Sequence, residues 1–405
     1  MRRRGLFPPV DLATSRKKRN KGPEPRSTLT VNGRLILRRR HYHSVDEGSS
    51  TPSDDLLDAV HDTISQATRE LCIQLNRASR SFGMTAENLK KAAQLTLSRE
   101  TMRQVVEAEG KAVLALARSG ALQPTWHAVD CKDQEGRSRV YLSSDGFMSP
   151  TITDAEKRSR REKVVEKRKG RRGSKRRLPP VKPGSDGHYK EFKAVMFFDH
   201  DLLHRQVSVT SGDCEAAGRL MMRDAGRLEF KAADQRVGLI DGGPWIIRQI
   251  RGRGLRTSAV GLDFYHLSEN VHKTRRVVFG EENEAGQAWA GDLMHTVKHE
   301  GYEPMRQKLM DLRLKHRRGR RGEIDRLIEY ASDRREMIRR PEFIANGWHI
   351  GSGAMESECR VIPDRVKGPG KRWDADNAEA IMALETMHQS GQSEAYRKLA
   401  MCRGN

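Results

Sequence analysis

The sequence is poor in cysteine and aromatic residues, and it has no long apolar run. Its five cysteines lie far apart without a Cys-x-x-Cys pair, which excludes a disulfide framework and a zinc ribbon. It contains no stretch of about 18 apolar residues, and its Met-Arg-Arg-Arg start leads into no apolar signal segment. We therefore expect a soluble, cytoplasmic protein without membrane contact.

Acidic residues are the minority among the charges. The 405 residues include 76 Lys and Arg against 54 Asp and Glu, which gives a formal net charge of +22. Such an excess of basic residues predicts a polyanionic partner, above all a nucleic acid. A basic surface that serves only solubility is the alternative.

The chain divides into segments of different pattern. Asn32-Gly33 lies between two β-prone runs and predicts a hairpin turn, and apolar spacing predicts helices from about residue 52 to 118. Five strands and several helices then alternate, with the strands expected at Arg139–Ser144, Tyr189–Phe198, His204–Val209, Arg236–Ile240 and Ala259–Leu262. Three strands, a helix, a strand, a helix, a strand, a helical insertion and a closing helix are the order of an RNase H-like α/β fold with a mixed sheet.

Six regions follow from this division. They are a disordered basic N-terminus (1–26), a β-hairpin with a helical, helix-turn-helix-like DNA-binding region (27–120), the first part of an RNase H-like catalytic core (121–280), an all-helical insertion (281–345), the last part of the core (346–390) and a C-terminal tail (391–405).

Three acidic residues stand where a strand ends or a helix turns: Asp145, Asp241 and Glu356. In the expected topology the first and fourth strands are neighbours, so Asp145 and Asp241 emerge side by side, and the closing helix brings Glu356 over the same edge. Three carboxylates can hold two Mg²⁺ ions, which Mn²⁺ can replace, for phosphoryl transfer at a phosphodiester. Each acid alone has a simpler explanation, because Asp-Gly is a common turn pair and Glu is favoured at a helix N-terminus.

Several other residues compete for a role in this site. Asp263 follows the fifth strand and is the main rival acid, while Asp130 precedes the first strand and is a weaker one. His266 could contact a phosphate or position the metal site, although a histidine in an amphipathic helix is more often structural. We expect Trp245 and Trp373 to serve packing and not base stacking.

Basic residues predict where DNA binds. Ser98 can cap a helix that would place Arg99 and Arg103 in a major groove, and a helical hairpin without DNA contact is the alternative. Residues 157–182 form a dense basic loop that would contact the DNA backbone. The further DNA-binding candidates are Lys169, Arg171, Arg172, Lys175, Arg176, Arg177, Lys367, Lys371 and Arg372.

Five motifs together resemble one known family. They are Ser-Asp145-Gly-Phe-Met-Ser-Pro, Asp241-Gly-Gly-Pro-Trp-Ile, Leu-Asp263-Phe-Tyr-His-Leu-Ser-Glu-Asn, Gly-Trp-His-Ile-Gly-Ser-Gly-Ala-Met-Glu356-Ser and Arg365-Val-Lys-Gly-Pro-Gly-Lys-Arg-Trp373. With them the chain resembles the bacterial insertion-sequence transposases of the DDE superfamily, specifically the ISKra type, over roughly residues 27–390. Family members usually carry a small cysteine motif after the hairpin. Here the corresponding residues 41–47 contain no cysteine, and we expect no zinc site in them.

The resemblance implies a function. It makes Asp145, Asp241 and Glu356 the catalytic and metal-binding triad of an enzyme that binds the terminal inverted repeats of its element, cleaves there, and joins the ends to target DNA. Such an enzyme acts on double-stranded DNA at the bacterial nucleoid, as a dimer or larger assembly. Two alternatives remain: a transposase-derived DNA-binding protein without activity, and a structure-selective RNase H-like nuclease.

Overall fold

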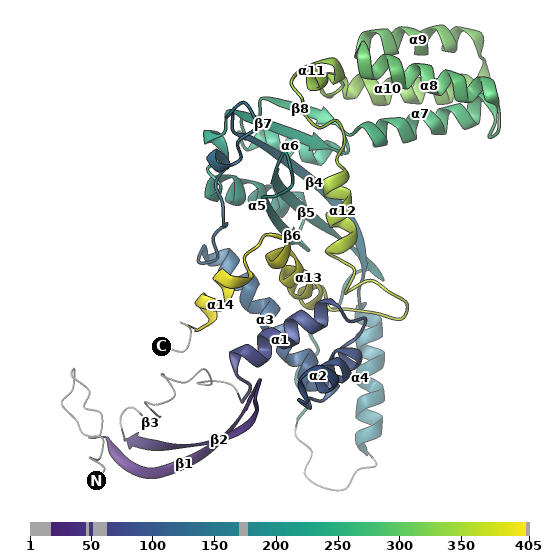
Figure 1. Ribbon diagram of the computed structural model, residues 1–405. Coiled ribbons are helices and arrows are strands. Elements are labelled where there is room, and N and C mark those ends of the chain that lie inside the picture. Colours follow the sequence, from purple (N-terminus) through teal and green to yellow (C-terminus); the bar gives the residue numbers. More distant parts are fainter. Residues whose placement is uncertain (1–17, 46–47, 52–62, 170–176, 402–405) are drawn as a thin grey trace. The chain divides into compact units, whose positions relative to one another are not determined.

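The chain folds as two compact units. The computed structural model describes residues 18–45, 48–51, 63–169 and 177–401. One unit is formed by Met1–Gln123 together with Gln392–Asn405, and the other by Pro124–Gly391 (Figure 1). Among the described residues, no helix has both the length and the apolar character that a membrane crossing requires.

A three-stranded antiparallel sheet begins the first unit. Its strands are β1 (Arg19–Thr30), β2 (Gly33–Ser44) and β3 (Gly48–Ser50), in the order β1-β2-β3. Thr30 pairs with Gly33, which confirms the hairpin but makes Val31-Asn32 the turn, one residue before the predicted pair. Gly33 has a φ of +106°, a conformation that favours glycine.

The prediction of disorder over residues 1–26 is wrong for the part that the structure describes as strand. Strand β1 begins at Arg19, although Pro23 and Pro25 within it have no backbone N–H to donate to a neighbouring strand. Both prolines are tolerated because β1 is an edge strand, where a missing N–H need not break a ladder bond. Residues 1–17 lie outside the described residues.

Four helices complete the described part of the first unit: α1 (Gln66–Arg77), α2 (Phe82–Ala93), α3 (Arg99–Ser119) and α14 (Ser393–Met401). Ser98 caps α3 as predicted, since its Oγ accepts a 3.0 Å bond from Thr101 N. The predicted C-terminal tail contains α14, whose Arg397 carbonyl accepts a 3.0 Å bond from Gln66 Nε2 of α1. Residues 52–62, where the first helix was expected to start, are outside the described residues.

The second unit is a mixed α/β structure around a five-stranded sheet. The strands are β4 (Arg139–Pro150), β5 (Tyr189–Asp199), β6 (Arg205–Thr210), β7 (Gln235–Ile240) and β8 (Ala259–Leu262), arranged in the order β6-β5-β4-β7-β8. Strand β4 is central; it pairs antiparallel with β5 and parallel with β7. Strand β8 continues the parallel half, and β6 is antiparallel to β5.

The two faces of β4 have different surroundings, because successive side chains of a strand point to opposite faces of the sheet. Val140 and Leu142 belong to the main apolar core. Helices α5 (Cys214–Arg227) and α6 (Pro244–Gly252) contribute Met221, Ile246 and Ile250 to that core. Asp145 and the intervening residues of β4 therefore face away from this core.

Strand β4 is longer than predicted, which corrects the expected position of Asp145. The strand does not end at Ser144 but runs to Pro150, and Asp145 pairs with Ala194 of β5. Asp145-Gly146 resembles a turn in sequence, yet the ladder to β5 carries the backbone straight through it. Only the ladder to β7 ends at Ser144.

Four packed helices follow the sheet: α7 (Phe264–Phe279), α8 (Glu284–His299), α9 (Tyr302–Lys315) and α10 (Arg318–Asp333) (Figure 1). The helical region thus includes α7 and starts before the expected boundary at residue 281. Short α11 (Arg340–Ala345) leads to α12 (Gly353–Val361) and α13 (Ala375–Gln389), close to the predicted closing helices. Helix α12 packs on β4, and α13 packs on β6.

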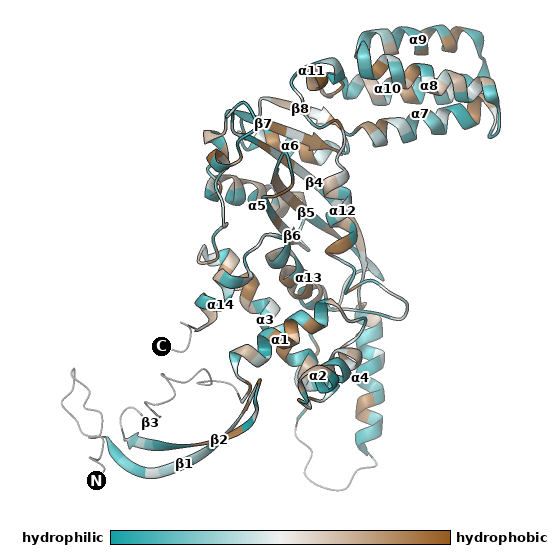
Figure 2. Ribbon diagram, in the orientation of Figure 1, coloured by the Kyte–Doolittle hydropathy of each residue, from teal (hydrophilic) through white to brown (hydrophobic). Residues whose placement is uncertain are grey.

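The predicted basic loop 157–182 is in large part a helix. Helix α4 spans Asp154–Lys169, and none of its 16 residues is buried. Figure 2 shows it hydrophilic along most of its length. Repulsion among the like charges of this segment predicts a loop, but Lys, Arg and Glu are good helix formers, and their propensity outweighs that repulsion here. Asp154 and Glu156 also lie in the first turn and Lys167, Arg168 and Lys169 in the last, which suits the helix dipole.

Candidate active site

Asp145 and Asp241 lie at the point where the adjacent strands β4 and β7 stop pairing. The parallel ladder of β4 and β7 ends at the pair Ser144 and Ile240. The next residue on each strand is an aspartate, and parallel strands reach the same edge of a sheet together. The neighbourhood expected for Asp145 and Asp241 is therefore confirmed.

Backbone N–H groups hold both carboxylates. Gly146 N donates to Asp145 Oδ1 over 2.6 Å, and Gly243 N donates to Asp241 Oδ1 over 2.7 Å. Gly242, which lies between Asp241 and Gly243 in the sequence, has a φ of +88°. A Cβ there would come within 2.6 Å of Leu262 Cδ1 and 2.7 Å of Arg334 Nε, so the turn that aims Asp241 requires glycine.

The surroundings of Asp145 disfavour its negative charge. Burial is the largest cause that raises the pKa of this carboxyl, and the charge of Asp241 raises the pKa further. The Gly146 N–H, the Cys359 thiol and the positive charge of His266 act in the opposite direction. A bound cation would offset both the burial and the repulsion, so the chemistry of this pair fits a divalent metal.

Helix α12 brings Glu356 to the same region. The ligand atoms of Glu356, Asp263 and His266 all lie within 4.8 Å of one another. Cys359, three residues after Glu356 on the same helix, has its Sγ 3.5 Å from Asp145 Oδ2. Residues three apart share a helix face, so one face of α12 joins the Asp263 group to Asp145.

The rival acid Asp263 is engaged by the backbone. It is fully buried and caps α7, where its Oδ1 accepts a 2.8 Å bond from His266 N. Its Oδ2 accepts a hydrogen bond from Ser352 N, just before α12. Asp263 thereby ties α7 to the loop that leads to Glu356. Asp130 lies elsewhere, in a short 3-10 helix before β4, where it accepts a 2.8 Å bond from His127 N.

Arg340 was not anticipated as part of the site. It is fully buried, and its Nη1 donates a 2.7 Å bond to Ile350 O in the loop before α12. Its Nε and Nη2 have no hydrogen-bond partner in the described chain. Burial lowers its pKa to about 10, while the nearby Asp263 charge favours the protonated guanidinium. No sequence pattern distinguishes Arg340 from the other arginines of its basic segment.

A basic hollow opens beside β4. It is a cavity of about 330 Å³ whose lining includes Lys367, Lys371 and Arg372, together with the apolar side chains of Met148 and Tyr189. Tyr189 is 58% exposed, and the Arg372 guanidinium lies 5.7 Å from its ring centre. Cations beside an exposed aromatic ring are the combination that nucleic acids contact.

The two tryptophans pack, as expected. Trp373 is buried, and its Nε1 donates a 3.0 Å bond to Val366 O, which folds the basic segment back on itself. Trp245 packs against the main core. Trp245 is partly buried, and Lys193 Nζ lies 5.6 Å from its ring centre.

The other predicted DNA-binding residues differ in their contacts. Arg99, Lys169 and Arg177 are exposed, and Lys169 Nζ lies 2.8 Å from Glu166 Oε2. Arg103 is engaged within α3, where Glu100 and Glu107 both bind its guanidinium. Four candidates lie outside the described residues: Arg171, Arg172, Lys175 and Arg176.

Comparison with known proteins adds no identity to this geometry. The chain matches no protein-family model and no curated protein.

Proposed function

We propose that the protein is a DNA transposase of the DDE superfamily, ISKra type, with Asp145, Asp241 and Glu356 as its catalytic acids. The observation that carries this proposal is the convergence of Asp145 and Asp241 at one sheet edge, under the helix that bears Glu356. The order β6-β5-β4-β7-β8, with β5 alone antiparallel to the other strands, supports an RNase H-like core.

The donor set fits divalent cations that prefer hard oxygen ligands, such as Mg²⁺ or Mn²⁺. When bound, two such ions would lower the pKa of an attacking water or 3′-hydroxyl and stabilise the leaving oxygen of the phosphodiester. Asp145 is suited to hold both ions because its carboxylate is affected by the charge of Asp241 and lies 3.5 Å from the Cys359 thiol of α12. Asp241 and Glu356 would each hold one.

The remaining residues fix the geometry of these acids. Asp263 joins α7 to the loop before α12, and Arg340 donates a hydrogen bond to the Ile350 carbonyl of that loop. Both contacts restrict where Glu356 can lie relative to the aspartate pair. Such positioning matters because a displacement of about 1 Å can reduce a catalysed rate about 100-fold.

The basic surfaces of the second unit supply a path for DNA. The hollow at Lys367, Lys371 and Arg372 borders β4, the strand that also carries Asp145. Helix α4 adds a charged face without a buried residue. We infer that these surfaces bind the phosphate backbone of element and target DNA, and that two or more protomers assemble on DNA to bring the two element ends together.

The test uses the full-length protein and a DNA carrying an end of its element. Native protein, Asp241→Ala and Glu282→Gln are each incubated with this DNA in Mg²⁺, in Mn²⁺ and in EDTA. Glu282 is an exposed acid between α7 and α8 and serves as the matched control. We expect metal-dependent nicking at the element end and strand-transfer products, absent from Asp241→Ala and retained by Glu282→Gln.

Three other outcomes would contradict the proposal. End-specific binding without cleavage in either metal would identify a DNA-binding protein derived from a transposase. Cleavage that depends on DNA structure and never yields joined products would identify a nuclease. Retained cleavage by Asp241→Ala would remove this acid pair from the chemistry.

A further inference from the structure

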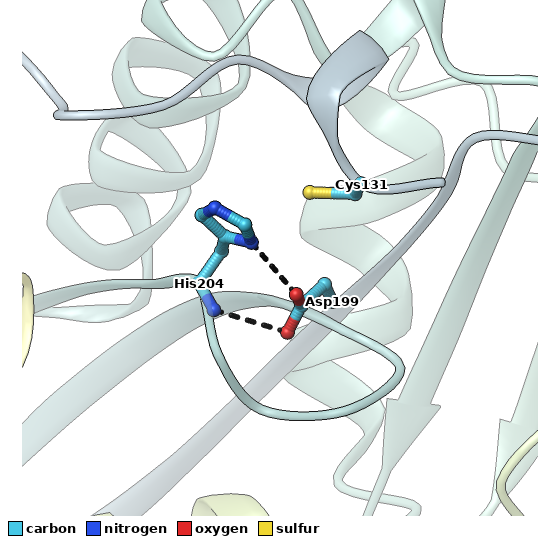
Figure 3. A group of neighbouring side chains, drawn as sticks. All are labelled: Cys131, Asp199 and His204. Atoms are coloured by element: carbon cyan, nitrogen blue, oxygen red, sulfur yellow. Dashed lines mark hydrogen bonds and ion pairs between the residues drawn. The ribbon is translucent and has the colours of Figure 1, made fainter. Parts of the chain in front are cut away.

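Cys131, Asp199 and His204 form a second group of candidate metal ligands (Figure 3). Cys131 follows the short 3-10 helix Ala128–Asp130, Asp199 ends β5, and His204 directly precedes β6. One ligand atom from each side chain lies within 4.8 Å of the other two. Cys131 and Asp199 are buried, and His204 is partly exposed. Three separate segments of the chain thus converge on one point.

The ligand types differ from those of the catalytic acids. A thiolate, an imidazole and a carboxylate are the three protein ligands that zinc binds most often, whereas Mg²⁺ prefers oxygen ligands alone. Three ligands also leave the fourth tetrahedral position to water or another donor. The chemistry of this group therefore favours Zn²⁺ over the ions suited to Asp145 and Asp241.

The strand register separates the two groups. Asp199 pairs with Val140, which precedes Asp145 on β4 by five residues. At about 3.3 Å per residue, this corresponds to roughly 16 Å along the strand. The cysteine group is thus a distinct site, independent of whether the acids catalyse anything.

The surroundings already orient two of the three ligands. His204 N donates a 3.1 Å bond to Asp199 Oδ1, which fixes the carboxylate, and His204 Nδ1 lies 2.7 Å from Asp199 Oδ2. The Trp126 ring lies beside the imidazole, with 5.6 Å between the ring centres. Two ligands of a tetrahedral zinc ion lie about 3.3 Å apart, so binding requires only a small opening of the Nδ1–Oδ2 contact.

We propose that Cys131, Asp199 and His204 bind a zinc ion, which fastens the segment before β4 to the β5–β6 turn. Binding would replace the thiol proton of Cys131, and the neutral imidazole of His204 would bind through Nδ1 and carry its single proton on Nε2. Because the ion would bind only the folded arrangement, its binding free energy would add to the stability of the second unit.

The test is metal binding by the full-length protein, followed with zinc and with Co²⁺ as a spectroscopic substitute. A cobalt–thiolate bond gives a charge-transfer absorption that carboxylates and imidazoles cannot give. The variants are Cys131→Ser and His204→Gln. The controls are Cys359→Ser, because Cys359 lies beside Asp145, and Asp241→Ala, which disables the acid pair. Circular dichroism verifies that each variant is folded.

We expect about one tightly bound zinc per chain and a thiolate band with cobalt. Cys131→Ser should lose the band, and His204→Gln should weaken zinc binding at least about tenfold. Cys359→Ser and Asp241→Ala should retain both signals. Absence of the band in the native protein, its survival in Cys131→Ser or its loss in Cys359→Ser would overturn the proposal. The Asp199–His204 hydrogen bond would then only close the β5–β6 turn.

Discussion

At the scale of single residues, Asp145 combines a proposed catalytic role with a cost to stability. Burial and the charge of Asp241 raise the pKa of this carboxyl, so the folded state disfavours its ionised form. We predict that Asp145→Asn abolishes metal-dependent cleavage and increases the free energy of unfolding at neutral pH by on the order of 1 kcal/mol. Chemical denaturation without metal measures the gain, and Mg²⁺ should stabilise the native protein but not the variant.

The sign of this effect sets its pH dependence. Because the folded-state pKa of Asp145 is raised, stability from the protonated carboxyl is present at low pH and is lost as the pH rises through that pKa. The advantage of Asp145→Asn should therefore vanish on acidification. An advantage that grows toward low pH would contradict the assigned direction.

Arg340 should be more important for stability than its neighbour in sequence. Arg340→Met keeps the volume but leaves Ile350 O with only its 3.0 Å bond from Phe264 N, and it leaves the buried Asp263 without the nearby cation. We expect a loss of about 3 kcal/mol in the free energy of unfolding and reduced cleavage. The control Arg339→Met breaks only a half-exposed pair with Glu342 and should cost less than about 1 kcal/mol. Equal losses in urea denaturation would show that the buried contacts of Arg340 are unimportant.

The sequence allowed part of the site to be predicted, and topology explains which part. Asp145 and Asp241 could be predicted as neighbours because each directly follows a residue of the last pair between the parallel strands β4 and β7. Cys359 could not be foreseen, because its contact with Asp145 depends on how α12 lies on β4. The capping of α7 by Asp263 was likewise hidden, because the same residue pattern fits a metal ligand.

At the scale of elements, α4 is a helix without a core to pack on. A helix that is polar on all sides is explained by many ion pairs, by solvent or by a partner. We predict that Arg160→Gln, Lys163→Gln and Lys167→Gln together weaken DNA binding and reduce its log–log salt slope by about 0.9 for each lost phosphate contact. Glutamine preserves helix propensity, so the helix itself should remain.

The control for α4 removes exposed arginines from the helical bundle. Arg306→Gln and Arg320→Gln lower the total charge without altering α4. Fluorescence anisotropy over a range of salt concentrations compares the two sets. If the bundle variant reduces the slope per removed charge as much as the α4 variant does, binding reflects net charge alone and α4 has no specific role.

Element boundaries show where sequence patterns were sufficient. Strands β5 and β8 were found because their apolar runs are buried in the sheet. The end of β4 was missed because Asp-Gly is typical of turns, while a cross-strand ladder decides the conformation there. The start of β1 was missed because prolines weaken a strand signal, although an edge position accommodates them.

At the scale of the whole molecule, the first unit is built from both ends of the chain. Its closing helix α14 buries Tyr396, whose hydroxyl donates to Glu109 of α3. Gln392 Nε2 of the same segment donates a 2.8 Å bond to Gln123 O. A chain that ends at Gly391 would lose these contacts but would keep every acid of the candidate active site.

We therefore predict that truncation after Gly391 lowers the stability of the first unit by about 3 kcal/mol, the scale of losing one buried aromatic side chain. Differential scanning calorimetry should show two transitions, of which only one moves. Lys398→Gln, a change at a largely exposed side chain of α14, should move neither. If both transitions fell together, the two units would unfold as one, and the first unit could not act as a DNA-binding module independent of the acids.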